Sequence, residues 1–471
     1  MEIPAYLKTG EVARLFPVIS ETGKEQKASS IFLAVISSIP ALAETLLSQA
    51  GQRLGSRSSV NTFTEVVFKD ENQKGKVDRP DGLIEVLSGK RKWTALVEAK
   101  IGNNTLDQDQ IERYLKLARD NSIDAVITIS NEFAALPTHH PLTVTKALTR
   151  KVSLYHFSWT AILTEAVLMH EQSLVSDSEQ AFLLREFIRF FSHSSAGVKG
   201  YVSMPEEWSV VVENIQAGGK VKKGEMGQQI VKGWHQELRD LSLLMSRLIG
   251  CHVTVKIGRA HVADVDRRVR DDLECLCSKG RLEAFLQIPD AASELQVVAD
   301  MRSRSLRMSM CIEAPKDKKT SKARVNWLLR QIKEIDPTSV SIGVIWASRA
   351  STTVVSLEEL RGNPENILTG SGPSIRAFEV ILTSNSARRF TGRRTFIEEI
   401  EILAPRYYEK FGQHLQSWKA LPPKPKHSIS EENNTPNEIE VSSESMQAGN
   451  VHHDLLDIPY FLQRVRRSNL T

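Results

Sequence analysis

The chain has 471 residues, a formal net charge of +4 at pH 7 and 41% hydrophobic residues, which fits a globular protein of roughly two to four domains. The charge is too small for this length to indicate a nucleic-acid partner by itself. Its four cysteines include no Cys-x-x-Cys pair, so they indicate neither a zinc ribbon nor a disulfide framework and favour a reducing, cytoplasmic compartment.

The start of the chain lacks a basic stretch followed by an apolar core, so we expect no signal peptide. The apolar run over residues 31–43 is shorter than the roughly 20 residues that cross a bilayer, and it is broken by Pro40 and ended by Glu44. It predicts a buried helix that bends or restarts at Pro40, and no transmembrane segment.

Strand and helix patterns alternate in the residues that follow. Turns rich in Gly and Lys separate the predicted strands. Strands are predicted over 61–68, 82–87, 93–100, 124–130 and 152–156, and helices over 107–121, 160–170 and 177–193. This order predicts an α/β domain over residues 1–200, with a mixed sheet and helices on its faces.

A second α/β (or α+β) domain is predicted over residues 224–421. Its expected helices span 230–249, 321–333 and 395–418, and its expected strands span 252–257, 306–312, 340–346 and 376–382. Residues 422–450 hold too few apolar side chains to fold, which predicts a disordered linker. Residues 451–471 turn apolar and basic again.

Two acids and a lysine lie at the open end of a predicted hairpin, opposite its turn. Asp81 opens one strand, and Glu98 and Lys100 close the next on one face, because side chains alternate along a strand. A turn near residues 88–92 would make residue 81 a cross-strand neighbour of 98–100. Carboxylates so close repel one another unless a cation compensates, and Mg²⁺ meets that need. Such an ion beside a lysine suits hydrolysis of a phosphodiester.

A simpler interpretation competes at this point. Asp81-Gly82 after Pro80 is also typical of a turn, and Glu98 with Lys100 can be an ordinary surface pair worth under about 1 kcal/mol. The surroundings favour the functional interpretation, because Pro-Asp precedes one strand, Glu-x-Lys closes the next, and a helix with a glutamine follows.

Pro80-Asp81 followed by Glu98-Ala99-Lys100 resembles the signature of the PD-(D/E)XK nuclease superfamily. Gln110 and Tyr114, one helical turn apart, are similar to the Gln-x-x-x-Tyr motif of its RecB-like and lambda-exonuclease-like branch. The resemblance covers roughly the first 160 to 200 residues and implies a restriction-endonuclease-like core. It also implies that Asp81, Glu98 and the carbonyl of Ala99 hold Mg²⁺ or Mn²⁺, with Lys100 as the catalytic lysine.

Two further acids are candidates for the same site. The superfamily often adds an acid from its first helix, where Glu25 stands, but Glu25 also completes a capping box with Thr22. Glu65 is expected to share a strand face with the apolar Phe63 and Val67, which argues against a simple surface role. The RecB-like branch often has a histidine in its first helix, and this chain has none there.

The sequence LLDIPYFLQR near the C-terminus resembles the C-terminal peptide of the bacterial tubulin-like cell-division protein FtsZ. Such a segment would dock into a groove of a protein partner, although it could instead fold back onto its own chain or touch a membrane through its arginines. Its anchors would be Leu456, Ile458, Pro459, Phe461 and Leu462.

The predicted function is a cytoplasmic, metal-dependent nuclease that hydrolyses DNA, of the kind that serves in restriction, repair or antiviral defence. The second domain would regulate, bind DNA through its basic clusters, or join protomers into a homo-oligomer. The alternatives are a catalytically inactive nucleic-acid-binding module and an adaptor that docks a partner through its C-terminal peptide. DNA versus RNA and endonuclease versus exonuclease stay open.

Overall fold

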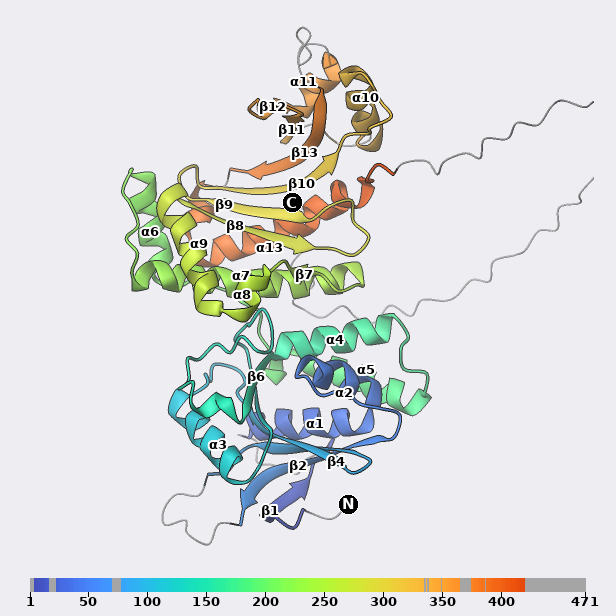
Figure 1. Cartoon of the computed structure of the whole chain (residues 1–471), viewed down its shortest axis with the longest axis vertical. Helices are drawn as coiled ribbons and strands as arrows, with labels where there is room; N and C mark the ends of the chain where they lie inside the picture. Colours follow the sequence, from blue (N-terminus) through green and yellow to red (C-terminus); the bar gives the residue numbers. More distant parts are fainter. Residues whose placement is uncertain are drawn as a thin grey trace, which may run out of the picture.

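The computed structural model describes residues 4–16, 23–69, 78–333, 336, 339–348, 350–364, 374–385 and 387–419. The predicted linker and the five predicted docking residues lie outside this part of the chain. The described residues form two units, one above the other along the long axis, and each unit is built on its own sheet (Figure 1).

The first unit is an α/β unit with a mixed sheet, as the sequence predicts. The strands follow chain order, with β1 to β4 antiparallel and with β4, β5 and β6 parallel. β1 was not predicted. The strands are β1 (Leu7–Val12), β2 (Ser58–Phe68), β3 (Gly82–Ser88), β4 (Arg91–Ala99), β5 (Ala125–Ser130) and β6 (Ser153–Ser158).

Helices cover both faces of this sheet. Ala95, Val97 and Ala99 of β4 belong to the core under α1 (Lys24–Ser38), α2 (Pro40–Gln49), α4 (Trp159–Glu171) and α5 (Ser178–Ser192). Leu96 belongs to the core under α3 (Gln108–Asp120) on the opposite face. Because side chains alternate along a strand, Glu98 points to the face that α3 covers.

The apolar run over 31–43 is buried, and most of α1 lies in the core. Pro40 occupies the start of α2, where its missing N–H costs no helical hydrogen bond. Among the described residues, no single helix is long and apolar enough to cross a membrane. α1 and α2 meet that criterion only when taken together, and the chain bends by 108° between them.

The second unit has a seven-stranded antiparallel sheet in the order β12-β11-β13-β10-β9-β8-β7. Its strands are β7 (Thr254–Val255), β8 (Arg281–Gln287), β9 (Leu295–Asp300), β10 (Ser305–Glu313), β11 (Val340–Trp346), β12 (Thr353–Ser356) and β13 (Ile375–Ser384). Its helices are α6 (Glu207–Gln216), α7 (Glu225–Ile249), α8 (Arg259–Ala263), α9 (Val265–Lys279), α10 (Ser321–Gln331), α11 (Leu357–Gly362), α12 (Ala387–Thr391) and α13 (Arg393–Lys410).

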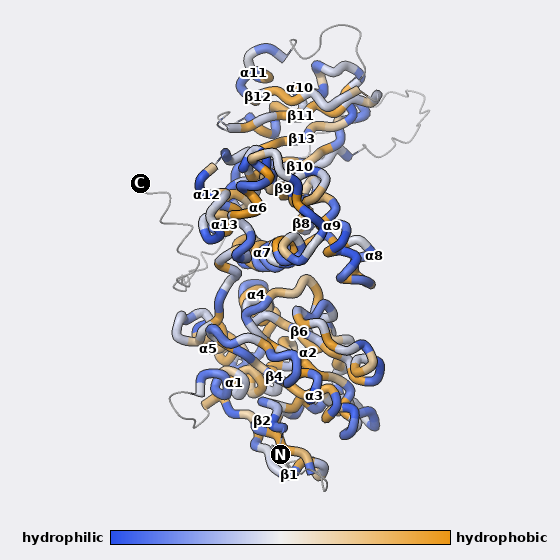
Figure 2. The backbone as a smooth tube through the Cα atoms, turned by 90° about the vertical axis from the view of Figure 1, so that its left-hand side faces the viewer, coloured by the Kyte–Doolittle hydropathy of each residue, from blue (hydrophilic) through white to orange (hydrophobic). Residues whose placement is uncertain are grey.

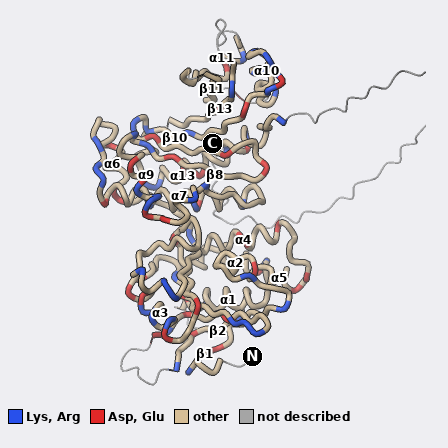
Figure 3. Tube along the Cα trace, in the orientation of Figure 1, with Lys and Arg blue, Asp and Glu red and all other residues tan. Residues whose placement is uncertain are grey.

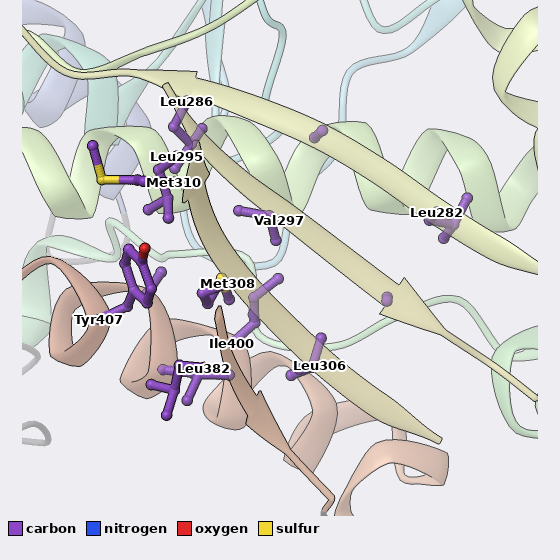
Figure 4. Packing of buried hydrophobic residues seen from close by; sticks show 14 of the residues in the cluster. Leu282, Leu286, Leu295, Val297, Leu306, Met308, Met310, Leu382, Ile400 and Tyr407 are labelled. Atoms are coloured by element: carbon purple, nitrogen blue, oxygen red, sulfur yellow. The ribbon is translucent and has the colours of Figure 1, made fainter. Parts of the chain in front are cut away.

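One face of this sheet forms a continuous core with α7 and α13. Val297, Met308 and Leu382 point from neighbouring strands toward Ile400 and Tyr407 of α13 (Figure 4). α6 joins the same core, so the packing extends the second unit upstream of the expected residue 224. The helix expected to reach residue 418 ends at Lys410, and the strand expected over 252–257 is only two residues long.

α7 and α4 join the two units, and they lie side by side in both views of the chain (Figures 1 and 2). Arg247 Nη1 of α7 donates a hydrogen bond to Thr164 Oγ1 of α4 at 2.5 Å. At the end of α4, Gln172 Nε2 donates to the Gly250 carbonyl oxygen at 2.9 Å. Direct contacts between helices therefore connect the units.

Candidate functional site

The β3–β4 hairpin brings Asp81 to the end of β4. Gly82 pairs with Val97 and Ser88 pairs with Arg91, so the turn lies where the sequence predicts it. Gly89 has φ +61°, a conformation that glycine adopts without steric cost. Asp81 Oδ2 accepts a hydrogen bond from the backbone N–H of Ala99 at 2.8 Å. The predicted cross-strand neighbourhood is confirmed.

Glu98 and Lys100 form a largely buried ion pair. Lys100 Nζ lies 2.6 Å from Glu98 Oε1, and their side chains are 17% and 2% exposed, respectively. Lys100 Nζ also lies 3.8 Å from Glu25 Oε2. An ordinary surface pair is therefore the wrong interpretation of the Glu-x-Lys triplet.

Glu25 reaches the site from the first turn of α1. Its Oε1 accepts hydrogen bonds from Asn104 Nδ2 at 2.7 Å and from Ile101 N at 3.3 Å. α1 begins at Lys24 with Gly23 at the N-cap position and without a side-chain cap. The carboxylate therefore faces the loop after β4 instead of its own helix end, which contradicts the capping-box interpretation; Thr22 lies outside the described residues.

Gln110 and Tyr114 contact each other on the face of α3 that covers the site. Gln110 Nε2 donates to the Tyr114 hydroxyl at 3.0 Å, and that hydroxyl donates to the Arg79 carbonyl oxygen at 3.1 Å. Asp107 caps the helix by accepting from the Gln110 N–H at 2.6 Å. The pair thus holds the segment that leads into Asp81.

Glu65 lies beside Asp81, but its carboxylate has other partners. It pairs with Arg79 Nη2 at 2.5 Å and accepts from Gln26 Nε2 at 2.9 Å. Its φ of 53° and a register shift against β1 mark a bulge at this point of β2. The prediction that Glu65 shares a strand face with Phe63 and Val67 is wrong, because the bulge interrupts the alternation of side chains along β2.

Acidic side chains outnumber basic ones in the site, and burial favours their neutral forms. Burial, followed by the charge of Glu98, raises the pKa of Asp81 to about 8. Burial also raises the pKa of Glu98, although the Lys100 ammonium opposes it. Burial alone would lower the pKa of Lys100, but the Glu98, Asp81 and Glu25 carboxylates together raise it. One ammonium therefore serves three carboxylates.

The site retains a buried acceptor. Glu98 Oε2 is buried and has no partner in hydrogen-bonding geometry among the described residues, although the Tyr114 hydroxyl, which donates to Arg79, is close enough to lower the pKa of Glu98. No group of three or more His, Cys, Asp or Glu side chains in the described part of the chain is arranged to hold a metal ion. Mg²⁺ usually takes only one or two protein carboxylates and completes its shell with water and substrate oxygens. Asp81 and Glu98 fit that requirement.

Three further residues hold the site in place. The Trp159 indole Nε1 donates to the Lys100 carbonyl oxygen at 2.9 Å. Asn104 binds Glu25, and Asn131 Nδ2 donates to the Gly102 carbonyl oxygen at 3.1 Å. No sequence pattern reveals such links, because each joins groups that are at least 29 residues apart along the chain.

Two buried histidines lie close to the row of cross-strand neighbours that begins at Glu98. Glu98 pairs with Thr128 on β5, and Thr128 pairs with His156 on β6. Thr128 Oγ1 lies 2.8 Å from His140 Nε2 and 2.9 Å from His156 Nδ1. Burial lowers the pKa of His140 to about 4, and burial with the neighbouring His140 lowers that of His156 to about 3. Both rings are therefore neutral at pH 7.

Acidic side chains lie among the basic clusters of the second unit, where Lys and Arg are interspersed with Asp and Glu along the chain (Figure 3). Arg270 pairs with Asp264 at 3.4 Å, and Arg389 pairs with Glu399 at 2.9 Å. These ion pairs reduce the positive charge that the clusters offer to a phosphate backbone.

Comparison of the chain with protein-family models, with curated proteins and with solved structures finds no match. The arguments about function therefore rest on the geometry of the site.

Proposed function

We propose that the chain is a metal-dependent nuclease of the PD-(D/E)XK type, and that its first unit is a restriction-endonuclease-like core. The observation that carries this proposal is the convergence of Asp81, Glu98 and Lys100 at one end of the β3–β4 hairpin, with Glu25 beside them. The alternation of helices, antiparallel strands and parallel strands agrees with that core.

The proposed ligands of Mg²⁺ or Mn²⁺ are the carboxylates of Asp81 and Glu98 and the carbonyl oxygen of Ala99. When bound, such an ion polarises a phosphoryl oxygen and lowers the pKa of a bound water. The Lys100 ammonium would stabilise negative charge on the phosphate in the transition state. Trp159 and Asn104 keep Lys100 and Glu25 in position through the hydrogen bonds described above.

The proposed substrate is DNA. Exposed basic side chains near the site support a polyanionic substrate, since Lys24 and Lys27 flank Glu25 on the exposed side of α1. Contacts of this kind neutralise phosphates without reading sequence. A cytoplasmic role in restriction, repair or antiviral defence is the corresponding proposal for its biology.

Cleavage of circular and linear DNA by the purified chain tests the proposal, with Mg²⁺ or Mn²⁺ against EDTA. We expect metal-dependent cutting that Lys100→Ala reduces by a factor of about 10² or more. Lys92→Ala is the matched control, because Lys92 also pairs with an acid in this hairpin, Glu85, at 2.6 Å. Unfolding curves of both variants separate lost chemistry from lost structure.

Cutting of circular DNA would identify an endonuclease. If the wild-type chain cuts neither form with either metal, the nuclease proposal is wrong. DNA binding without cutting would then favour the inactive nucleic-acid-binding alternative.

A further inference from the structure

A cavity of ≈ 340 Å³ lies where the two units meet. Its walls come from α4, α5 and residues 198–202 on one side, and from α7, α12 and α13 on the other. Small-molecule sites typically measure about 300–1,000 Å³ and often lie between domains. The cavity therefore has the size and the location of a site for a small ligand.

The lining carries more acids than bases. Asp240, Glu398 and Glu401 face two arginines, Arg247 and Arg389. Arg389 is engaged at the rim, where its Nη2 lies 3.2 Å from Glu398 Oε2. In the deeper part of the cavity, Arg247 acts on both Asp240 and Glu401. The buried Arg239 and the Tyr201 N–H, which donates to Asp240 Oδ2 at 2.6 Å, also compensate Asp240.

A further carboxylate increases this excess. Glu237 of α7 is fully buried, and neither of its carboxylate oxygens has a hydrogen-bond partner among the described residues. Burial, and then the charges of Glu401 and Asp240, raise the pKa of Glu237 well above its usual range, so this carboxyl adjoins the same part of the cavity. Buried carboxylates normally have cationic or hydrogen-bonding partners. A cation in the cavity would supply one.

Most of the rest of the lining is apolar, apart from Thr160 and Ser192. Leu163, Phe191, Val198, Val202, Leu244 and Ile402 form this part of the wall. We propose that the cavity binds a small organic cation, with an ammonium group directed to Asp240 and Glu401 and an apolar body against Phe191 and its neighbours. All of these lining residues belong to the described part of the chain.

Two chains of contacts lead from the cavity to the candidate nuclease site. The ring of Phe191 stacks on Trp159 with centroids 5.0 Å apart and an interplanar angle of 18°. Trp159 in turn donates its indole N–H to the Lys100 carbonyl oxygen at 2.9 Å. A ligand that moves Phe191 would therefore move the backbone that carries Lys100.

The second chain of contacts passes through the segment between Val198 and Gly200, both of which line the cavity. The intervening Lys199 N–H donates to Asn131 Oδ1 at 3.1 Å, and Asn131 Nδ2 donates to the Gly102 carbonyl oxygen at 3.1 Å. The loop that contains Gly102 also holds Asn104, the partner of Glu25. We infer that occupancy of the cavity regulates the candidate site; this regulatory part rests on the proposed nuclease function.

Binding is tested with benzylamine as the cationic probe, titrated into the full chain by calorimetry. Benzyl alcohol is the neutral control of similar shape, and benzoate is the anionic control. We expect benzylamine to bind about tenfold or more tightly than benzyl alcohol, because a charged hydrogen bond to a carboxylate is stronger than a neutral one. Equal affinities would overturn the proposal, because they would mean that the buried carboxyls need no cation.

Variants locate the binding. Glu401→Gln keeps the shape of the side chain and is expected to weaken benzylamine binding about tenfold. Val202→Trp fills the mouth of the cavity from a side chain that is 55% exposed, so it is expected to abolish binding without unfolding the chain. Glu409→Gln, on the exposed side of α13, is the matched control and should bind as the wild type does. Binding that survives both lining variants would overturn the proposal.

A spectroscopic signal tests the location independently of activity. The ¹⁹F resonance of 5-fluorotryptophan at position 159, assigned by its loss in Trp159→Phe, is expected to shift with the same midpoint as the calorimetric titration. Binding without this shift would place the probe elsewhere and overturn the inference. Probe binding in a chain that cuts no DNA would overturn the nuclease and its regulation but leave the cavity site. Cutting of DNA by a chain that does not bind the probe would overturn the cavity site and its regulation but leave the nuclease proposal.

Discussion

Replacing Lys100 with methionine removes the ammonium that lies 2.6 Å from Glu98 Oε1, in a pair whose side chains are 17% and 2% exposed, respectively. Removal of one member of a buried ion pair leaves the other charge uncompensated, which costs about 3–5 kcal/mol. Since the ammonium keeps some contact with water, we expect the lower end: Lys100→Met lowers the free energy of unfolding by about 3 kcal/mol in EDTA. Glu98→Gln in the same chain should restore most of that loss, because it removes the uncompensated charge.

Equilibrium unfolding in urea measures these differences. Lys256→Met is the control, because its ammonium also lies 2.6 Å from a carboxylate oxygen, Glu294 Oε1, while the two side chains are 50% and 33% exposed, respectively. Exposed pairs contribute about 0–1 kcal/mol, so this variant should lose little stability. Equal losses in the two single variants, or a double variant no more stable than Lys100→Met, would refute the assignment of a buried, charge-compensating role to Lys100.

Tyr114→Phe removes the hydroxyl that donates to the Arg79 carbonyl oxygen at 3.1 Å, and it should lower the free energy of unfolding by about 1 kcal/mol in the same assay. Because the pKa values of buried His140 and His156 are lowered to about 4 and about 3, the unfolded chain binds protons below pH 6.5 that the folded chain does not. The contribution of the two rings to stability should therefore fall as the pH drops from 6.5 toward 4, by up to about 1.4 kcal/mol per pH unit for each ring. Asp81, whose raised pKa favours the folded chain over the same range, contributes with the opposite sign, so the difference between the wild type and His140→Asn in urea titrations isolates the His140 part. Mn²⁺ at a hundredfold excess over its Kd should stabilise the wild type by about 2.7 kcal/mol, and Asp81→Asn should abolish that gain.

The hairpin and its acids could be predicted because they depend on short-range rules. Because side chains alternate along a strand, Glu98 and Lys100 must lie on the same face. Because a short turn joins β3 to β4, Asp81 must lie close to Ala99 on the neighbouring strand. Gln110 and Tyr114 follow from helical periodicity in the same way. Each of these relations needs only the local geometry of one element or one hairpin.

The sequence did not reveal relations that depend on packing between distant elements. Glu25 has the residues of a capping box, yet it contacts Asn104, which is far along the chain. The Glu65 side chain does not lie on the expected strand face, because Glu65 has a φ of 53° and stands at a bulge that adds a residue to the strand. β1 was missed because its exposed and buried positions do not alternate regularly: Leu7 is buried and the residues after it are mostly exposed. Tertiary contacts decide all three cases.

The two proposed sites share an electrostatic property that a stable fold alone does not require. Near Lys100, one ammonium serves three carboxylates, and at the junction of the units Glu237 is buried with neither carboxylate oxygen hydrogen-bonded among the described residues. A buried acid without a cationic partner either loses its charge, as the raised pKa values of Asp81 and Glu237 indicate, or lowers stability, so a cation that binds either place would recover part of that cost. Trp159 and Phe191 stand between the two places in direct contact. Ligand binding at one place therefore has a physical means to change the affinity of the other, and thermodynamic reciprocity requires the effect to act in both directions.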